Sequence, residues 1–319
     1  MQLTGWIEEN GRQLDRAGIE TFAKSRLAAC GGEFIIETDD CFIRDKYHIM
    51  PGLTEGKRVI TAEPRVPDMP LCEAIETAVS LRTAKDAVTT LSGGVDSSLV
   101  AVLAGLPCIA VGVPGSHDLA AAEKTAEILG LPLTVKEIGT DDIRAALEEV
   151  IAVIPRITPL DVEIAITGYF IAQTAKEAGA SRVLTGQAAD ELFGGYARYG
   201  RSADLRADLA ADFAGLAQQR ERDAAVAALF GVWYSLPFMD ERVVRASRKF
   251  SAEGLVCGDL RKTALRKVAS TYLPEEIAWR PKKAMQYGSG VSAALEKIAK
   301  REGCRRSGEL IEKLAAGKI

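Results

Sequence analysis

The chain has 319 residues, of which 47% are hydrophobic and 26% charged, and its formal net charge is −4. These proportions are ordinary for a soluble globular protein, and the slightly acidic balance provides no basic surface for nucleic acid. No apolar run reaches the length of about 18 residues that spans a bilayer, and the first residues, MQLTGWIEENGRQ, do not have the layout of a secretion signal. We therefore expect a cytoplasmic protein without a membrane segment and without a nucleic-acid partner.

Six cysteines and two histidines are scattered along the chain, and no two cysteines have C-x-x-C spacing. Zinc sites and iron–sulfur clusters need cysteines or histidines at short, regular spacings. The sequence therefore predicts neither kind of site, and the cysteines are expected to be small packing residues in a reducing compartment.

The first sixty residues contain few helical patterns and predict a small β unit. The segment GEFIIETDDCFIRDKYHIMPG (32–52) alternates apolar and polar residues around Thr38-Asp39-Asp40, which is typical of a hairpin. The proline-rich stretch AEPRVPDMP (62–70) predicts a link to the main domain. We expect residues 1–65 to form the β unit and residues 66–319 to form the main domain.

From Leu71 to about Gly195 the pattern alternates between helix and strand. The expected helices are 71–85, 97–105, 117–130, about 141–152 and 159–179. The expected strands are 87–91, 108–113, 133–138 and 182–185. Apolar strands that alternate with helices predict an α/β fold with a parallel, doubly wound sheet, and such sheets bind ligands at the carboxyl ends of their strands. A largely helical C-terminal part is expected over 203–319, with interruptions at 235–243 and 280–290.

The segment AVTTLSGGVDSS (87–98) is the most informative in the chain, because a buried strand leads through a glycine-rich loop into a helix. Glycines let backbone N–H groups approach an anion, and the helix N-terminus adds partial positive charge. The serines offer hydroxyl donors, and Asp96 offers an oxygen ligand for Mg²⁺. The loop has no lysine and the chain has no GxxxxGK[ST] motif, so this is not the P-loop that handles β- and γ-phosphates. The loop predicts nucleotide binding.

A second loop, LTGQAADELFGGYARY (184–199), again joins a strand exit to glycines and an acidic pair, Asp190-Glu191. A carboxylate facing Asp96 across the strand ends would allow two oxygens to hold a Mg²⁺–pyrophosphate. The alternative is that Asp190 only caps a helix.

Five segments, in this order, resemble the synthetase domain of class B, glutamine-dependent asparagine synthetases and the related β-lactam synthetases. They are SGGVDSS (92–98), AVGVPGSHDLAAAEKTAEILG (110–130), TGQAADELFGGYARY (185–199), LPFMDERVV (236–244) and RKTALRKVASTYLPEEIAWRPKKAMQYGSG (261–290). The resemblance covers about residues 60–319. It implies the fold of the pyrophosphate-loop (PP-loop) ATP pyrophosphatases, the use of ATP and Mg²⁺, an acyl-AMP intermediate, and displacement of AMP by ammonia or an amine.

Matched by position, the resemblance implies three sets of site residues. The pyrophosphate would be held by Ser92, Gly93, Gly94, Asp96, Ser97 and Ser98. The adenine and ribose would be lined, largely through backbone groups, by Leu91, Val111, Gly112 and Gly186. Asp96 and Asp190 would bind Mg²⁺, and Lys282 would offset the charge on the leaving pyrophosphate. The alternative for Lys282 and Lys283 is a solvated basic surface.

Gln187 departs from the family pattern. Asparagine synthetases have a glutamate at this position, and β-lactam synthetases have a tyrosine with a partnering glutamate elsewhere. A glutamine cannot take a proton, so Gln187 cannot be the general base for an incoming ammonium or amine. The alternative carboxylates are Asp190, Glu191, Asp161 and Glu163, and the sequence leaves the choice among them open.

The resemblance also implies an N-terminal glutaminase that starts with a catalytic cysteine, whereas this chain begins Met-Gln-Leu. Only FIRDKYHIMPGL (42–53) is similar to the end of that domain, and the internal Cys30 and Cys41 lack the free α-amino group that an N-terminal nucleophile uses. We therefore expect no glutaminase activity in this chain. Free ammonia, an amine substrate or a separate glutaminase subunit would supply the nitrogen.

The sequence thus favours an ATP-dependent, AMP-forming amide ligase of the asparagine synthetase type, with aspartate as the carboxylate by resemblance alone. One alternative is another reaction of PP-loop enzymes, such as thiolation or nitrogen insertion on tRNA or a small molecule. The lack of a cysteine pair counts against it, and Gln187 keeps it open. The other alternative is an inactive nucleotide-binding subunit, and the joint presence of Ser92, Asp96, Asp190 and Lys282 counts against that.

Overall fold

The computed structural model describes residues 1–52, 54–281 and 288–317, and the chain divides into two compact units. Unit 1 consists of Met1–Thr83, Thr185–Ala217 and Ser235–Val268. Unit 2 consists of Ala84–Leu184, Gln218–Tyr234 and Ala269–Ile319. These units do not follow the boundary expected near residue 65, because later segments of the chain complete the compact unit that contains the N-terminal sheet.

The N-terminal sheet of unit 1 has the strand order β2-β1-β3-β4-β5. Its strands are β1 (Gln2–Glu9), β2 (Arg12–Gln13), β3 (Gly31–Glu37), β4 (Cys41–Arg44) and β5 (Arg58–Thr61). β3 and β4 pair antiparallel with Ile36 opposite Ile43, which confirms the hairpin around Thr38-Asp39-Asp40. β1 was not predicted from the sequence, although it pairs with β3 along seven residues.

One face of this sheet carries a hydrophobic core in unit 1. Its members are Leu3, Ile7, Ile19, Leu27, Cys30, Phe34, Ile36, Cys41, Ile43 and Ala62. Ile19 and Leu27 come from α1 (Arg16–Ile19) and α2 (Lys24–Leu27), two single-turn helices that close over the strands. The expected scarcity of long helices in the first sixty residues is confirmed.

The other segments of unit 1 are mainly helical. They are α3 (Leu71–Ser80), α8 (Ala189–Phe193), η1 (Ala197–Arg201), η2 (Pro237–Met239), α10 (Glu241–Ser247), α11 (Ala252–Leu255) and a small hairpin of β11 (Val256–Cys257) and β12 (Leu260–Arg261). α9 (Leu205–Ala228) and α12 (Thr263–Ala269) each start in unit 1 and end in unit 2. α3 ends five residues before the expected Lys85.

The second sheet has the strand order β10-β9-β6-β7-β8. Its strands are β6 (Ala87–Thr90), β7 (Cys108–Gly112), β8 (Leu133–Glu137), β9 (Arg182–Leu184) and β10 (Trp233–Ser235). β9, β6, β7 and β8 pair in parallel, which confirms the predicted parallel α/β sheet. The chain passes from β6 to β7 and β8 on one side and returns to β9 on the other, so the strand order reverses beside β6. Sheets of this kind bind ligands outside the carboxyl ends of the strands at such a reversal.

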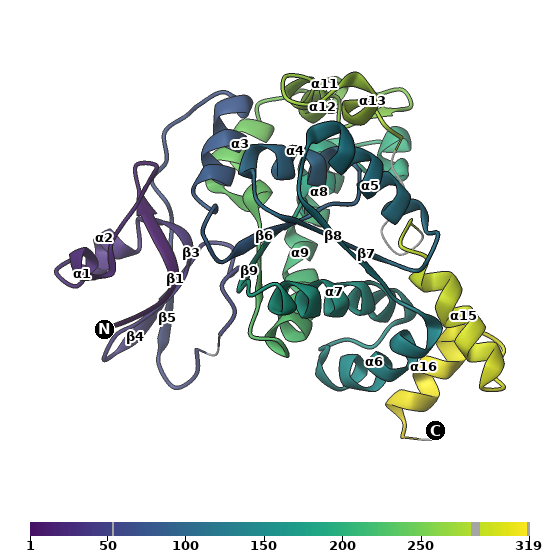
Figure 1. Cartoon of the computed structure of the whole chain (residues 1–319). Coiled ribbons are helices and arrows are strands. Elements are labelled where there is room, and N and C mark those ends of the chain that lie inside the picture. The colour runs from purple at the N-terminus through teal and green to yellow at the C-terminus, as the bar shows by residue number, and fades with distance from the viewer. Residues whose placement is uncertain (53, 282–287, 318–319) are drawn as a thin grey trace. The chain divides into compact units, whose positions relative to one another are not determined.

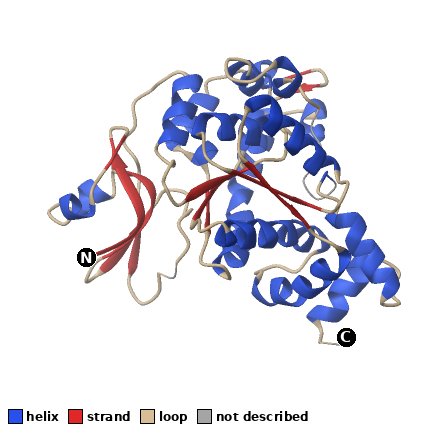
Figure 2. Cartoon of the chain, in the orientation of Figure 1, coloured by secondary structure: helices blue, strands red, loops and turns tan. Residues whose placement is uncertain are grey.

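Helices cover both faces of this sheet (Figure 1). α4 (Val95–Ala104) and α5 (His117–Leu129) lie on one face, and α6 (Thr140–Val153) and α7 (Pro159–Glu177) lie on the other. Figure 2 shows the same helices, in blue, around the red strands. Glycines in left-handed conformation end α4 and α5, and Thr158 accepts a hydrogen bond from the backbone of Asp161 at the start of α7.

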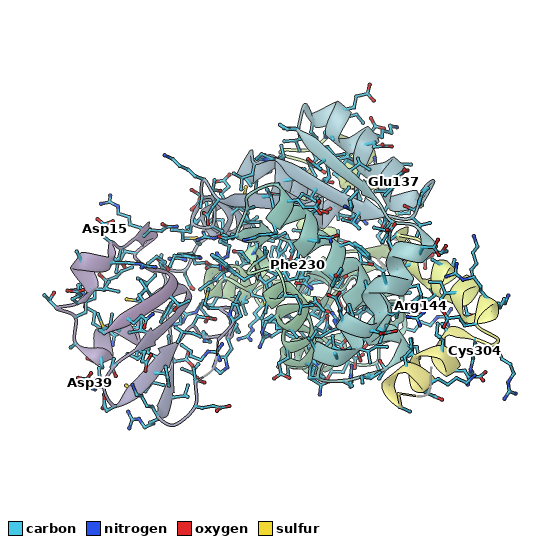
Figure 3. The ribbon with its side chains drawn as sticks, turned by 60° about the horizontal axis from the view of Figure 1, so that its bottom comes forward. Asp15, Asp39, Glu137, Arg144, Phe230 and Cys304 are labelled. Atoms are coloured by element: carbon cyan, nitrogen blue, oxygen red, sulfur yellow. The ribbon has the colours of Figure 1, made fainter. Side chains whose placement is uncertain are left out.

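The last helices of unit 2 are α13 (Glu275–Ala278), α15 (Val291–Arg301) and α16 (Ser307–Ala315), and they confirm the expected helical C-terminal part. Arg144 on α6 is 2.6 Å from Glu302, which precedes Cys304 in the turn after α15 (Figure 3). Among the described residues, none of the helices combines the length and apolar character that a bilayer crossing requires.

Candidate active site

The loop between β6 and α4 has a backbone suited to an anion. Gly93 has a φ of +72°, and a Cβ at this position would lie 2.6 Å from the carbonyl carbon of Ala121 on α5. Any residue other than glycine at position 93 would therefore clash with α5. Gly94 is the N-cap residue of α4 and provides no side-chain cap, and uncapped N–H groups at a helix N-terminus suit an anion.

The three serines of this loop divide into two roles. Ser97 Oγ lies 3.0 Å from Ser92 Oγ and accepts a hydrogen bond from Ser92 N at 3.2 Å, so this pair fixes the turn. Ser98 is fully buried, and within the described chain its hydroxyl has no hydrogen-bond partner. A buried hydroxyl of this kind is the group that a bound phosphate would satisfy. Asp96 is in the first turn of α4, where the helix dipole favours a carboxylate.

Arg280 supports the same loop and was not singled out from the sequence. Its Nη1 donates to the Gly93 carbonyl at 2.8 Å and to Thr125 Oγ1 at 2.9 Å. Arg280 therefore ties the loop to α5 from a position 187 residues further along the chain. The sequence signal was the basic motif Arg280-x-Lys282, from which only Lys282 was chosen. Lys282 and Lys283 lie outside the described residues, and their roles stay predictions.

The end of β7 forms the second part of the site in unit 2. Gly112 is the last residue of the strand, and a Cβ there would lie 2.5 Å from Ser116 Oγ and 3.2 Å from the Ser289 carbonyl. Val113 N donates to the same carbonyl at 2.8 Å. Ser116 is buried, and its Oγ has no hydrogen-bond partner in the part of the chain that the structure describes.

Leu91 and Val111 are both buried. Their contribution to an adenine or ribose pocket, together with that of Gly112 and Gly186, stays a prediction.

The loop after β9 presents Asp190 in the first turn of α8, whose N-cap residue is Ala188, with a φ of +71°. The helix-cap alternative for Asp190 is therefore wrong. Asp190 Oδ1 instead lies 2.6 Å from Nζ of Lys262, a fully buried lysine with a φ of +59°. A Cβ at Gly195 would overlap the Asp190 carboxylate, so the glycine makes room for this pair. Lys262 is a second site residue that sequence reasoning missed, although it lies within the quoted segment 261–290.

Asp96 belongs to unit 2 and Asp190 to unit 1, and their shared Mg²⁺ site stays a prediction. No group of three or more His, Cys, Asp or Glu side chains that could hold a metal occurs within the described residues. Mg²⁺ in nucleotide enzymes is usually bound by one or two carboxylates together with substrate phosphates and water. Asp96 in unit 2 and Asp190 in unit 1 each provide a carboxylate of this kind.

Gln187 follows the end of β9 closely and is held by local hydrogen bonding. Its backbone N–H donates to Thr185 Oγ1 at 3.3 Å. The Thr185 N–H in turn donates to the Ser235 carbonyl at 3.1 Å.

The four carboxylates that could replace the family glutamate have different surroundings. Asp190 pairs with Lys262, and buried Glu191 accepts a hydrogen bond from Tyr196. Burial raises the pKa of Glu191, and the tyrosine hydroxyl opposes that rise.

Asp161 is paired with two arginines, Arg156 at 2.7 Å and Arg222 at 3.3 Å. Burial alone would raise the pKa of Asp161, but the hydrogen bonds and the two cations outweigh it and lower that pKa. Glu163, one half-turn further along α7, accepts a hydrogen bond from Ser292 Oγ at 3.2 Å.

The chain is similar in sequence to known proteins. The asparagine synthase family matches residues 71–233 and 218–309. A Methanocaldococcus jannaschii protein assigned as asparagine synthetase 1 (glutamine-hydrolyzing) is 37% identical over 255 residues, which are 66% of this chain and 47% of that protein. Asparagine synthetase B (glutamine-hydrolyzing) of Escherichia coli is 28% identical over 258 residues, 70% of this chain and 45% of that protein. The chain spans about half the length of these relatives.

Among solved structures, matches include an NH3-dependent NAD synthetase from Campylobacter jejuni, with a TM-score of 0.29 and 19% identity over 39% of this chain and 57% of that chain. An NMN synthetase from Francisella tularensis matches with a TM-score of 0.34 and 16% identity over 79% of this chain and 94% of that chain. The matched family segments run from residue 71 to residue 309, well over half of the sequence. The chain therefore belongs to the asparagine synthase family.

Proposed function

We propose that this chain is an ATP-dependent, AMP-forming amide ligase that activates a carboxylate for attack by ammonia or an amine. The observation that carries the proposal is the loop after β6. It combines a glycine that no other residue can replace without a clash, a buried hydroxyl with no partner among the described residues, and no lysine. Such a loop suits the leaving pyrophosphate of an α–β cleavage better than the terminal phosphate of a kinase or ATPase. Aspartate is the proposed carboxylate on the strength of the family alone.

In the first proposed step, the substrate carboxylate attacks the α-phosphorus of ATP and pyrophosphate leaves. Backbone N–H groups of Gly93, Gly94 and the start of α4 would bind the pyrophosphate oxygens, and the hydroxyl of Ser98 would add a donor. Asp96 and Asp190 would hold Mg²⁺, which offsets phosphate charge when bound. Lys282 would add a further positive charge to the same leaving group.

In the second proposed step, the nitrogen nucleophile attacks the acyl carbon and AMP leaves. The nitrogen would come from free ammonia, an amine substrate or a separate glutaminase subunit. The lack of a proton acceptor at Gln187 means that another group must receive the proton of an incoming ammonium.

The direct test incubates the purified chain with ATP, Mg²⁺, ammonium and a panel of carboxylates, and measures AMP, ADP, pyrophosphate and amide. AMP, pyrophosphate and asparagine are expected when aspartate is present. AMP with a product other than an amide would favour another PP-loop reaction, and ATP binding without turnover would favour an inactive subunit. Release of ADP would refute the proposal. Asp96→Ala is expected to abolish AMP formation, and unchanged turnover in that variant would refute the metal assignment.

A further inference from the structure

Glu163 is a buried carboxylate at the ligand-binding edge of unit 2. It lies in the second turn of α7, and only about 9% of the residue is exposed. α7 leads into β9, which runs parallel to β6, so the start of this helix lies toward the carboxyl ends of the strands. The first turns of α7 therefore belong to the same edge as the loops that follow β6 and β7.

Hydrogen bonds connect Glu163 to the end of β7 through one short segment. Ser292 Oγ, on α15, donates to Glu163 Oε1 at 3.2 Å. Three residues earlier, the Ser289 carbonyl accepts a hydrogen bond from Val113 N at 2.8 Å. Val113 follows Gly112 directly. The segment 289–292 therefore contacts Glu163 at one end and the proposed nucleotide pocket at the other.

Rigid elements hold this arrangement in place. Arg144 on α6 is 2.6 Å from Glu302, so an ion pair fastens the end of α15 to α6. Figure 3 shows Arg144 beside the turn that carries Cys304. A carboxylate positioned by two helices keeps one orientation, which proton transfer requires.

Glu163 also differs from its neighbour Asp161 in charge balance. Asp161 is neutralised by Arg156 and Arg222, whereas across the described residues no lysine, arginine or histidine forms an ion pair with Glu163. Burial raises the pKa of Glu163, the Ser292 hydrogen bond opposes the rise, and Glu296 on α15 adds to it. A buried carboxylate with a neutral partner attracts a cation, and it accepts a proton more readily than an exposed one.

We propose that Glu163 binds the ammonium or amine nucleophile and accepts its proton, supplying the carboxylate that Gln187 lacks; this inference rests on the proposed function. An N–H bond of the ammonium breaks and its proton passes to a Glu163 carboxylate oxygen. The freed lone pair of nitrogen forms the C–N bond, the C–O bond to AMP breaks, and AMP leaves with that electron pair. The second proton of the adduct passes to water.

The test separates adenylation from nitrogen attack in full-length Glu163→Gln. Carboxylate-dependent exchange of pyrophosphate into ATP reports the first step alone and is expected to stay within about twofold of the parent. Amide formation from ammonium at pH 7 is expected to fall by about 100-fold or more, the usual contribution of a general base. Hydroxylamine is largely unprotonated at this pH, so its reaction is expected to fall by less than about tenfold.

Glu149→Gln is the matched control, because Glu149 on α6 also accepts a hydroxyl hydrogen bond, from Tyr169 at 3.1 Å, but is exposed. It is expected to change none of the three readouts. Equal losses with ammonium and hydroxylamine, loss of pyrophosphate exchange, or full ammonium activity in Glu163→Gln would overturn the assignment of Glu163. Absence of carboxylate-dependent exchange in the parent chain itself would instead reject the proposed function, and the inference with it.

Discussion

Gly93→Ala tests whether the close approach of the loop to α5 shapes the nucleotide site. The native φ of +72° is a left-handed conformation that costs a non-glycine residue about 1 kcal/mol. The new methyl group would also lie 2.6 Å from the Ala121 carbonyl carbon and oxygen, and 2.7 Å from its Cβ. Backbone atoms of a helix cannot rotate away, and overpacking of this kind costs roughly 1–3 kcal/mol. The expected loss in the free energy of unfolding is therefore about 2–4 kcal/mol.

Gly105→Ala provides a control for the backbone part of this cost. Gly105 ends the same helix, α4, with a φ of +59°, and an added Cβ would meet no atom within 4 Å. Its loss in unfolding free energy is expected to be about 1 kcal/mol, the conformational cost alone. The difference between the two variants then measures the steric conflict with Ala121.

Urea denaturation gives the unfolding free energies, and calorimetric titration with a non-hydrolysable ATP analogue gives the affinities. Gly93→Ala is expected to weaken nucleotide binding by at least about tenfold, equivalent to about 1.4 kcal/mol, because the loop must move away from α5. Gly105→Ala is expected to bind as the parent does. Equal destabilisation by the two substitutions, or parental affinity in Gly93→Ala, would show that the contact with Ala121 does not constrain the loop.

Three further predictions concern polar groups that are buried or partly buried. Arg280→Met removes the hydrogen bonds to Gly93 and Thr125 and should weaken ATP binding, measured by equilibrium dialysis. The control Arg301→Met, which breaks an exposed ion pair with Asp141, should bind ATP as the parent does. Equal affinities of the two variants would show that Arg280 does not support the loop. Lys262→Met should lower the unfolding free energy by roughly 2 kcal/mol in urea denaturation. This loss is smaller than the loss on breaking a fully buried ion pair, because Asp190 is partly exposed. An unchanged urea midpoint would contradict the prediction. Burial raises the pKa of Asp45 from 3.8 to about 6. Between these two pH values the folded state keeps a proton that the unfolded chain has lost. The unfolding free energy should therefore fall as the pH rises from about 4 to 6. Asp45→Asn should remove this fall, and an unaltered pH profile in the variant would reject the assignment.

The sequence predicted well what local patterns determine. The helices and strands from Leu71 to Leu184 lie close to their expected positions, because apolar periodicity and glycine or proline boundaries are local signals. β10 was missed because three residues between a turn and Pro237 are too few to show a period. β1 was missed because its glycine and buried Glu8 interrupt the alternation expected of a strand.

In the candidate site, too, the sequence predicted the features that depend on local patterns and missed those that depend on the fold. Its glycines and serines could be chosen from the loop pattern, because their role depends on the turn itself. Arg280 and Lys262 could not, because their partners Gly93 and Asp190 lie 187 and 72 residues away and only the fold brings them together. Among four candidate carboxylates, the neighbouring side chains separate Asp161 from Glu163, and sequence spacing does not carry that information.

The N-terminal sheet illustrates why a boundary drawn from sequence composition can differ from a physical one. Glu33 on β3 is fully buried and accepts hydrogen bonds from Arg82 at 2.7 Å, from Ser235 Oγ at 2.6 Å and from Leu236 N at 3.0 Å. The Ser235 carbonyl in turn accepts from Thr185 N, at the start of the loop that carries Gln187 and Asp190. Separating the sheet at residue 65 would remove one of the two buried carboxylates, Glu33 and Asp240, that pair with the Arg82 guanidinium in the core of unit 1, and losing a partner of a buried ion pair is destabilising. A buried carboxylate on the N-terminal sheet thus supports, through Ser235, the loop that carries Gln187 and Asp190.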